Sequence, residues 1–216
     1  DPSGPIGLSL TRQKLPTLAG TAEHAREGLR RGAYVLRDAS DGRDPEVILI
    51  GTGSELQLAF GAAERLEGEG VAARVVSMPC WERFELQDQA YRDEVLPPSV
   101  RARVSVEVGV SLGWERWVGD AGAIVGLDHF GASAPAGTIF EKFGFTIDRV
   151  ADVARQVIAG KLHGPVPTLE PGHLPAPRRG QPTHAASDDR ARDDHPSLGH
   201  DDPGVARTGS TDPGHS

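Results

Sequence analysis

The chain has 216 residues, a formal net charge of −8 and one cysteine. The acidic balance argues against a nucleic-acid partner, which needs a basic face, and the single cysteine excludes a disulfide within the chain and fits a reducing compartment. No apolar run approaches the roughly 20 residues that span a bilayer, so we predict a cytoplasmic protein with no membrane partner.

The first segment has the pattern of a strand. Ile6, Leu8 and Leu10 alternate with small or polar residues, and Arg12 follows, which is typical of a half-buried strand that ends on a guanidinium. Ligands of open α/β sheets gather at the carboxyl ends of strands, and a guanidinium can bind phosphate or carboxylate through two parallel hydrogen bonds. Arg12 is therefore a candidate anion-binding residue. The alternative is a surface arginine that closes a strand.

This first strand has no obvious neighbour in the chain, because the strands that follow form a regular series of their own. The chain begins at Asp1, and its one methionine is Met78. We therefore expect it to be a piece of a longer protein.

From about Gly32 to Gly160 the sequence alternates strand and helix patterns. Apolar runs closed by glycine or proline predict buried strands, and the segments between them have helical periodicity; these stretches include "EVILIGTG", "SELQLAFGAAERLEGEG", "AARVVSMP", "ARVSVEVG", "GAIVGL" and "TIDRVADVARQVIAG". Ser54 with Gln57 predicts a capping box, and Thr146 predicts an N-cap. Strands separated by helices imply right-handed crossovers. We therefore predict an α/β fold with a three-layer, mostly parallel sheet flanked by helices.

The last segment, residues 164–216, is rich in proline, glycine, aspartate, histidine and arginine. It contains too few apolar residues to offset the entropy of ordering a backbone, about 1–2 kcal/mol per residue, so we predict a disordered C-terminal tail. Six of the eight histidines lie between His163 and His215. Their irregular spacing, without clustered acids or cysteines, predicts no metal site.

Four further features could carry chemistry. The turn "IGTGSE" (50–55) could hold an anion at a helix start, but it lacks a dinucleotide or P-loop pattern and carries an acid, which favours a tight capped turn. Cys80 has no histidine nearby in sequence, so an inert thiol is the better interpretation. His129 is expected in a loop after a strand. Trp114 and Trp117 are expected to pack in a core or a subunit contact. The residues alone therefore predict an α/β domain without a visible active site.

Several stretches, taken together and in this order, resemble the carboxyl-terminal end of transketolase. The match is dense from about Gly4 to Gly160, and its most specific parts are "ARVVSMP", "FGASAP" and "FGFT"; the other matching stretches are "SLTRQKLP", "RGAYVLRDA", "VILIGTGSELQLA", "RVSVEVGVSLGWERWVG" and "VIAG". Residues beyond about Gly164 look unlike the family.

The resemblance implies an organisation for the chain. The expected parts are the last strand of an otherwise missing pyrimidine-binding domain (1–15), a linker (16–32), the transketolase C-terminal domain (33–163) and the tail (164–216). The family implies a homodimer in the complete enzyme. It also implies that the C-terminal domain does not touch the cofactor, so its role looks structural or dimer-supporting.

The resemblance also implies a function. Transketolases use thiamine diphosphate and a divalent metal, Mg or Ca, to pass a two-carbon ketol unit from a ketose phosphate to an aldose phosphate of the pentose phosphate pathway. Arg12 in "LTRQ" matches the family arginine that grips the sugar phosphate, although Thr11 stands where serine is frequent. The chain has no counterpart of the family's catalytic, cofactor-binding or metal-binding residues. We therefore expect it to be inactive without the missing N-terminal domains.

Two alternatives come from other classes. The chain could be a stand-alone assembly subunit of a split thiamine enzyme, paired with a separate chain. It could also be a small nucleotide-binding α/β protein that uses the glycine turn at 50–55.

Overall fold

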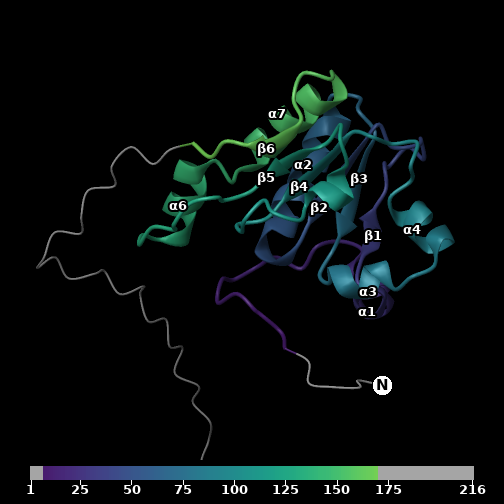
Figure 1. Ribbon diagram of the computed structural model, residues 1–216, viewed down its shortest axis with the longest axis horizontal. Coiled ribbons are helices and arrows are strands. Elements are labelled where there is room, and N and C mark those ends of the chain that lie inside the picture. The colour runs from purple at the N-terminus through teal and green to yellow at the C-terminus, as the bar shows by residue number, and fades with distance from the viewer. Residues whose placement is uncertain (1–6, 170–216) are drawn as a thin grey trace, which may run out of the picture. The chain divides into compact units, whose positions relative to one another are not determined.

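The computed structural model describes residues 7–169, which contain one six-stranded sheet (Figure 1). The strands are β1 (Tyr34–Arg37), β2 (Val47–Gly51), β3 (Ala73–Ser77), β4 (Arg103–Val106), β5 (Ala123–Val125) and β6 (Gly164–Val166). Their order in the sheet is β1-β3-β2-β4-β5-β6. Strand β1 runs antiparallel to β3, and all other neighbouring pairs are parallel. The predicted mostly parallel sheet is confirmed, and the antiparallel orientation of its edge strand β1 goes beyond the prediction.

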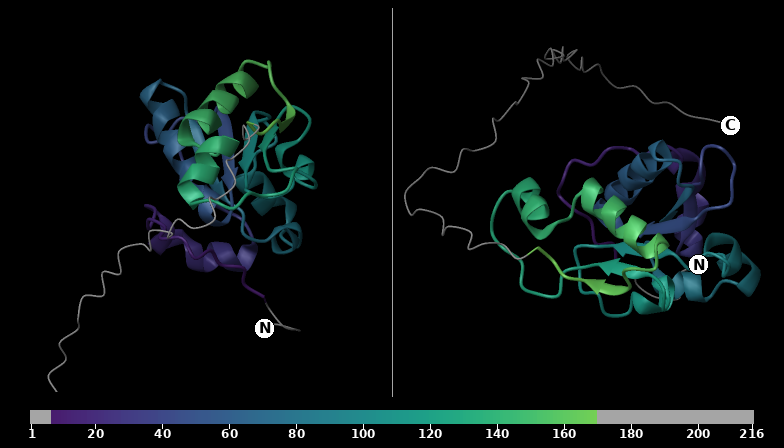
Figure 2. Two further views of the ribbon diagram at one scale, coloured as in Figure 1. Left: turned by 90° about the vertical axis from the view of Figure 1, so that its left-hand side faces the viewer. Right: turned by 90° about the horizontal axis from the view of Figure 1, so that it is seen from above.

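Helices cover both faces of this sheet. They are α1 (Thr21–Arg31), the short 3₁₀ helix η1 (Gly53–Glu55), α2 (Leu56–Gly68), α3 (Trp81–Glu85), α4 (Gln89–Val95), α5 (Glu115–Val118), α6 (Ala136–Phe143) and α7 (Ile147–Ile158). Helices α2 and α7 lie side by side over one face (Figure 2) and share a core with it. Helices α3, α4 and α5 contribute to a second core on the other face. The predicted three-layer α/β fold is therefore confirmed.

Strand β2 shows why a continuous apolar run suits this position. Val47 and Leu49 belong to the core under α2 and α7, and Ile48 and Ile50 belong to the opposite core. Side chains alternate between the faces of a strand, so a strand covered on both faces must be apolar at every position.

The helix ends agree with the sequence in part. The Oγ1 atom of Thr146 accepts a hydrogen bond from the backbone N–H of Arg149 at 3.2 Å, as an N-cap should. The predicted capping box at α2 does not form. The Gln57 side chain donates to the Ser54 carbonyl at 3.0 Å, and the Ser54 hydroxyl bonds instead to the neighbouring Glu55 carboxylate.

The strand predicted at residues 6–11 does not form in the part that the structure describes. Residues 7–11 belong to no strand, and the Leu8 and Leu10 side chains are 79% and 81% exposed; Ile6 lies outside the described residues. A strand forms only where a neighbour satisfies its backbone groups and covers its apolar face. The sheet built by residues 34–166 offers this segment neither.

Two other predicted segments contain secondary structure that their sequence pattern did not indicate. The expected linker, 16–32, contains helix α1, which packs on β1 and ends where Gly32 adopts a left-handed conformation. The tail, expected to be disordered from residue 164, begins with β6, whose pairing with β5 satisfies its backbone groups. The rest of the predicted tail, from residue 170, lies outside the described residues.

Candidate functional site

The parallel strands place the candidate residues along one edge of the sheet. The turn 52–55 follows β2, Cys80 follows β3, Glu107 follows β4 and His129 follows β5. Because the carboxyl ends of parallel strands meet at the same edge, these residues gather there although they are distant in sequence. We call this the carboxyl edge of the sheet.

A cavity of about 620 Å³ opens at the carboxyl edge. Its walls come from residues 7–11, Leu29 of α1, the turn 52–55, Pro79 and Glu107. The turn belongs to β2 and Glu107 to β4, between which the chain changes direction across the sheet. Such a switch point is the usual ligand crevice of an open α/β sheet. Residues 7–11 thus lie along this crevice.

Two carboxylates give this cavity its chemical character. Glu55 is only 6% exposed, and its carboxylate accepts hydrogen bonds from the Ser54 hydroxyl and, at 3.3 Å, from the Val108 backbone N–H. Burial raises the pKa of the Glu55 carboxyl above its ordinary value, and the nearby charge of Glu107 raises it further. Glu107 accepts a hydrogen bond of 2.8 Å from Nε1 of Trp114. The cavity can therefore accept hydrogen bonds, but it disfavours a phosphate.

The two carboxylates help to decide between two interpretations of the turn at 50–55. From the sequence, this turn could be an anion site or a tight strand-to-helix turn. In the structure the turn is followed by η1 and α2, and a buried carboxylate lies in its first helical turn. The tight turn is the better description, and the Glu55 charge opposes a nucleotide phosphate at this place.

Arg12 lies in the segment that borders the cavity but does not line it. The preceding hydroxyl, Thr11 Oγ1, accepts a hydrogen bond of 3.2 Å from the Gln13 backbone N–H, which bends the chain here. Arg12 is exposed. Within residues 7–169 its guanidinium makes no hydrogen bond or ion pair, so it can engage an anion from outside this region.

Cys80 and His129 are held by local contacts. The Cys80 sulfur lies 3.5 Å from a carboxylate oxygen of Glu82, which offers no basic partner for a nucleophile. The Nδ1 atom of His129 lies 2.8 Å from the Phe130 carbonyl, and Nε2 lies 2.9 Å from Thr168 Oγ1. Both ring nitrogens are thus engaged by loop contacts, and His129 is a loop residue, as predicted.

The tryptophans pack in the core, as predicted. Trp114 and Trp117 are buried, and the ring of Trp81 meets the ring of Trp114 edge-on at a centroid distance of 4.9 Å. Their rings form part of the core beneath α3 and α5. Trp114 has a further part at the carboxyl edge that its sequence pattern does not indicate, because its indole N–H donates a hydrogen bond to Glu107.

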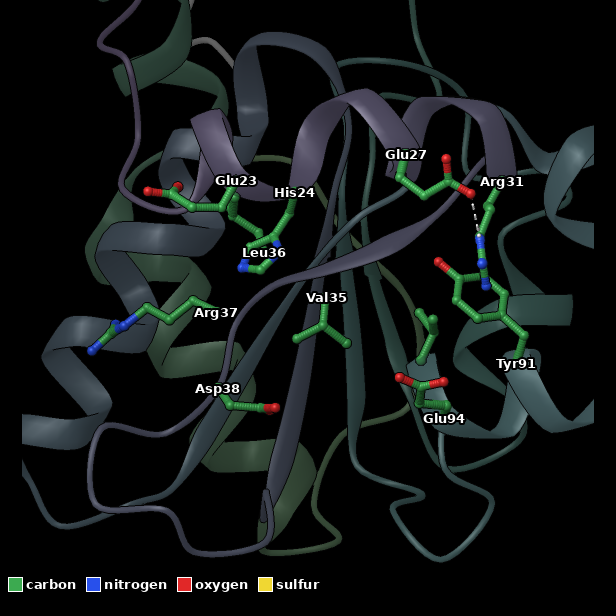
Figure 3. A pocket seen from close by; sticks show the side chains of 12 residues that line it. Glu23, His24, Glu27, Arg31, Val35, Leu36, Arg37, Asp38, Tyr91 and Glu94 are labelled. Carbon is green, nitrogen blue, oxygen red and sulfur yellow. Dashed lines mark hydrogen bonds and ion pairs between the residues drawn. The ribbon is translucent and has the colours of Figure 1, made fainter.

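A second cavity, of about 480 Å³, lies between α1, β1 and α4 (Figure 3). Arg31 lies 4.4 Å above the ring of Tyr91 and bonds to Glu27 at 3.1 Å. The Tyr91 hydroxyl donates to the Ala33 carbonyl at 2.8 Å, and burial raises the pKa of Tyr91. These side chains bond to one another across the helix–strand junction. Packing between these elements therefore accounts for the polar side chains of this cavity, without a ligand. No sequence motif indicates this cavity, because its lining comes from three separate segments.

Residues 7–169 contain no candidate metal site. In this range no three His, Cys, Asp or Glu side chains come together in a way that could hold a metal ion. None of the helices described there has the length and apolar character to cross a membrane.

Comparisons with known proteins agree on one family. Residues 32–146 match the family model described as the transketolase-like TK C-terminal domain. The chain is 55% identical over 146 residues to a transketolase of Geobacillus stearothermophilus, covering 68% of this chain and 22% of the relative. It is 52% identical over 158 residues to a transketolase of Mycobacterium leprae, covering 72% and 22%. The chain thus spans about a fifth of the length of these relatives.

Solved structures give the same result. A transketolase from Leishmania mexicana is 43% identical and superposes with a TM-score of 0.57, covering 66% of this chain and 20% of that one. A Pichia stipitis transketolase in complex with sedoheptulose-7-phosphate is 38% identical, with a TM-score of 0.61, covering 68% and 20%.

Proposed function

We propose that this chain, which belongs to the transketolase family, is the C-terminal part of an enzyme that moves a two-carbon ketol unit from a ketose phosphate to an aldose phosphate. The observation that carries the proposal is the 55% identity over 146 residues to a transketolase. The chain covers about a fifth of such relatives, so we propose that it is inactive alone and acts in the cytoplasm within a complete, dimeric enzyme. In this proposal residues 1–15 are the end of the pyrimidine-binding domain, and residues 16–32 are a linker that includes helix α1. Residues 33–163 form the C-terminal domain together with β6, which completes its sheet.

Arg12 is the residue that we assign to the substrate. Its exposed guanidinium lies on the segment that borders the carboxyl edge. We propose that it binds the phosphate of the sugar, because a guanidinium forms paired, charge-assisted hydrogen bonds with phosphate oxygens. The sugar phosphate named for one Pichia stipitis transketolase structure supports this substrate class.

The described residues do not fit the family's cofactor, thiamine diphosphate, or its divalent metal. The carboxyl-edge cavity contains the Glu55 and Glu107 carboxylates, which repel a diphosphate, and within residues 7–169 there is no cluster of metal-binding side chains. We therefore assign cofactor binding to other parts of the complete enzyme and derive no step through the cofactor here.

The role of Arg12 can be tested in a chimeric enzyme, in which this chain replaces the matching region of the Geobacillus stearothermophilus transketolase. Replacing Arg12 with alanine should remove a charge-assisted bond of about 1.5–3 kcal/mol. We expect kcat/KM for phosphorylated sugars to fall about 10- to 100-fold, with a smaller fall for substrates that lack phosphate.

The matched control is Lys14→Ala, which removes a positive charge two residues away and should change kcat/KM little. Equal losses on both substrate types, or equal losses in the two variants, would contradict the phosphate role. A chimeric enzyme without ketol transfer, alongside an active Geobacillus parent, would contradict the proposed function itself.

A further inference from the structure

Large apolar side chains are exposed on the two loops that leave β4 and β5 at the carboxyl edge. Val110 and Leu112 are 62% and 79% exposed, and Phe130 is 99% exposed. We call these three residues the loop surface. Single exposed apolar residues are ordinary, but several together on one side of a domain mark an interaction site.

The two loops are fixed to each other and to the core. The backbone N–H of Leu127 donates to the Gly109 carbonyl at 2.7 Å, and the N–H of Ser111 donates to the Asp128 carboxylate at 2.8 Å. Ser111 is buried although both of its neighbours in sequence are exposed. The backbone therefore holds Val110 and Leu112 outward, and their exposure is built into the fold.

The loop surface continues toward the segment that enters the domain. Glu107, at the start of the β4 loop, lines the same cavity as residues 7–11, and Leu8 and Leu10 of that segment are also largely exposed. In a protein as long as the transketolase relatives, the polypeptide before residue 7 arrives at this edge. About four fifths of each such relative lies outside the match, which is ample material to cover the loop surface.

We propose that the loop surface docks against the part of a transketolase that precedes this region. This inference rests on the proposed function and identifies a partner and the residues that meet it. Burying a large apolar side chain at such a contact stabilises the docked state. An aspartate at the same place would lose that stabilisation and also require the burial of a charge.

The test uses the chimeric enzyme with Leu112→Asp or Phe130→Asp. The control, Ser99→Asp, adds the same charge at an exposed position before β4, at the opposite edge of the sheet. We expect both loop-surface variants, but not the control, to be cut between the grafted region and the rest of the enzyme about tenfold faster or more under limited proteolysis. Thermal unfolding of the 216-residue chain alone should be nearly unchanged by Phe130→Asp, which separates docking from folding.

Three outcomes would overturn the inference. Cleavage rates equal to those of the control would show that the loop surface is not covered by the preceding region. Unfolding of the isolated Phe130→Asp chain would show a folding role instead. Sedimentation of the isolated chain as a dimer that Phe130→Asp dissolves would identify a second copy as the occupant. A chimeric enzyme that lacks ketol transfer but protects its loop surface from the protease contradicts only the proposed function.

Discussion

Strand β2 and the segment 7–15 are both rich in large aliphatic side chains, yet their surroundings are opposite. All four apolar residues at 47–50 are fully buried, and β2 pairs with β3 on one side and β4 on the other. Residues 7–15 pair with no strand, and Leu8, Leu10 and Leu15 are exposed. The difference shows that an apolar pattern alone does not determine burial. Such a segment is buried only where the rest of the fold supplies neighbouring strands to pair with and helices to cover it.

The largest effect should come from shortening a side chain of β2, measured against the same change in the segment 7–15. Leu49→Ala leaves a cavity between β2 and the helices above it, and should lower the free energy of unfolding by about 2–5 kcal/mol. Leu10→Ala should change it by less than about 0.5 kcal/mol, because the side chain is already in water. Urea unfolding of the isolated chain measures both. Similar losses in the two variants would break the comparison and place Leu10 in a core.

The comparison can be extended to charged residues with two arginines close in sequence. The partly buried guanidinium of Arg103 donates to the carbonyls of Leu96, Pro97, Val100 and Trp117 at 2.9–3.1 Å, and burial lowers its pKa. Arg103→Ala should therefore cost about 1–3 kcal/mol, since buried acceptors lose their donors. Arg101 pairs with Asp120 in solvent, so Arg101→Ala should matter little. Equal effects in thermal unfolding would contradict this contrast.

The smallest effect is expected at Glu55, in the turn after β2, which lines the same cavity as residues 7–11. Its pKa is raised in the folded chain, so the folded state binds the proton more tightly than the unfolded state does. Stability is then lost as the pH rises from about 4.3, the value in an unfolded chain, through the raised folded value. Glu55→Gln should remove this part of the pH dependence while keeping an acceptor for Val108. Urea unfolding between pH 4 and 8 measures it, and parallel curves for the two proteins would contradict the assignment.

The sequence predicts those features that depend on local pattern. The buried strands, the N-cap at Thr146 and the three-layer sheet follow from periodicity and from short-range hydrogen bonds. Helix α1 lies in the segment predicted to be a linker, and the glycine that ends it, Gly32, is the one sequence signal for it. Strand β6 was missed because it is short and contains a proline, so its pattern is too weak to recognise without β5 beside it.

The features of the candidate site also divide into those that the sequence predicts and those that it does not. Because a mostly parallel sheet is predicted, the carboxyl ends of its strands are expected at one edge. The carboxyl ends of β2, β3, β4 and β5 lie at one edge of the sheet. The burial of Glu55 and the bond between Trp114 and Glu107 could not be predicted. Both depend on loops that meet only after the sheet has formed.

Strand β6, at one margin of the described sheet, contains a proline. Pro165 lies opposite Ile124 in a strand at one margin of the sheet. Proline carries no backbone N–H, so this short margin presents an interrupted row of donors to a strand from another molecule. Aggregation by strand addition begins at open sheet margins, and Pro165 opposes it at this one.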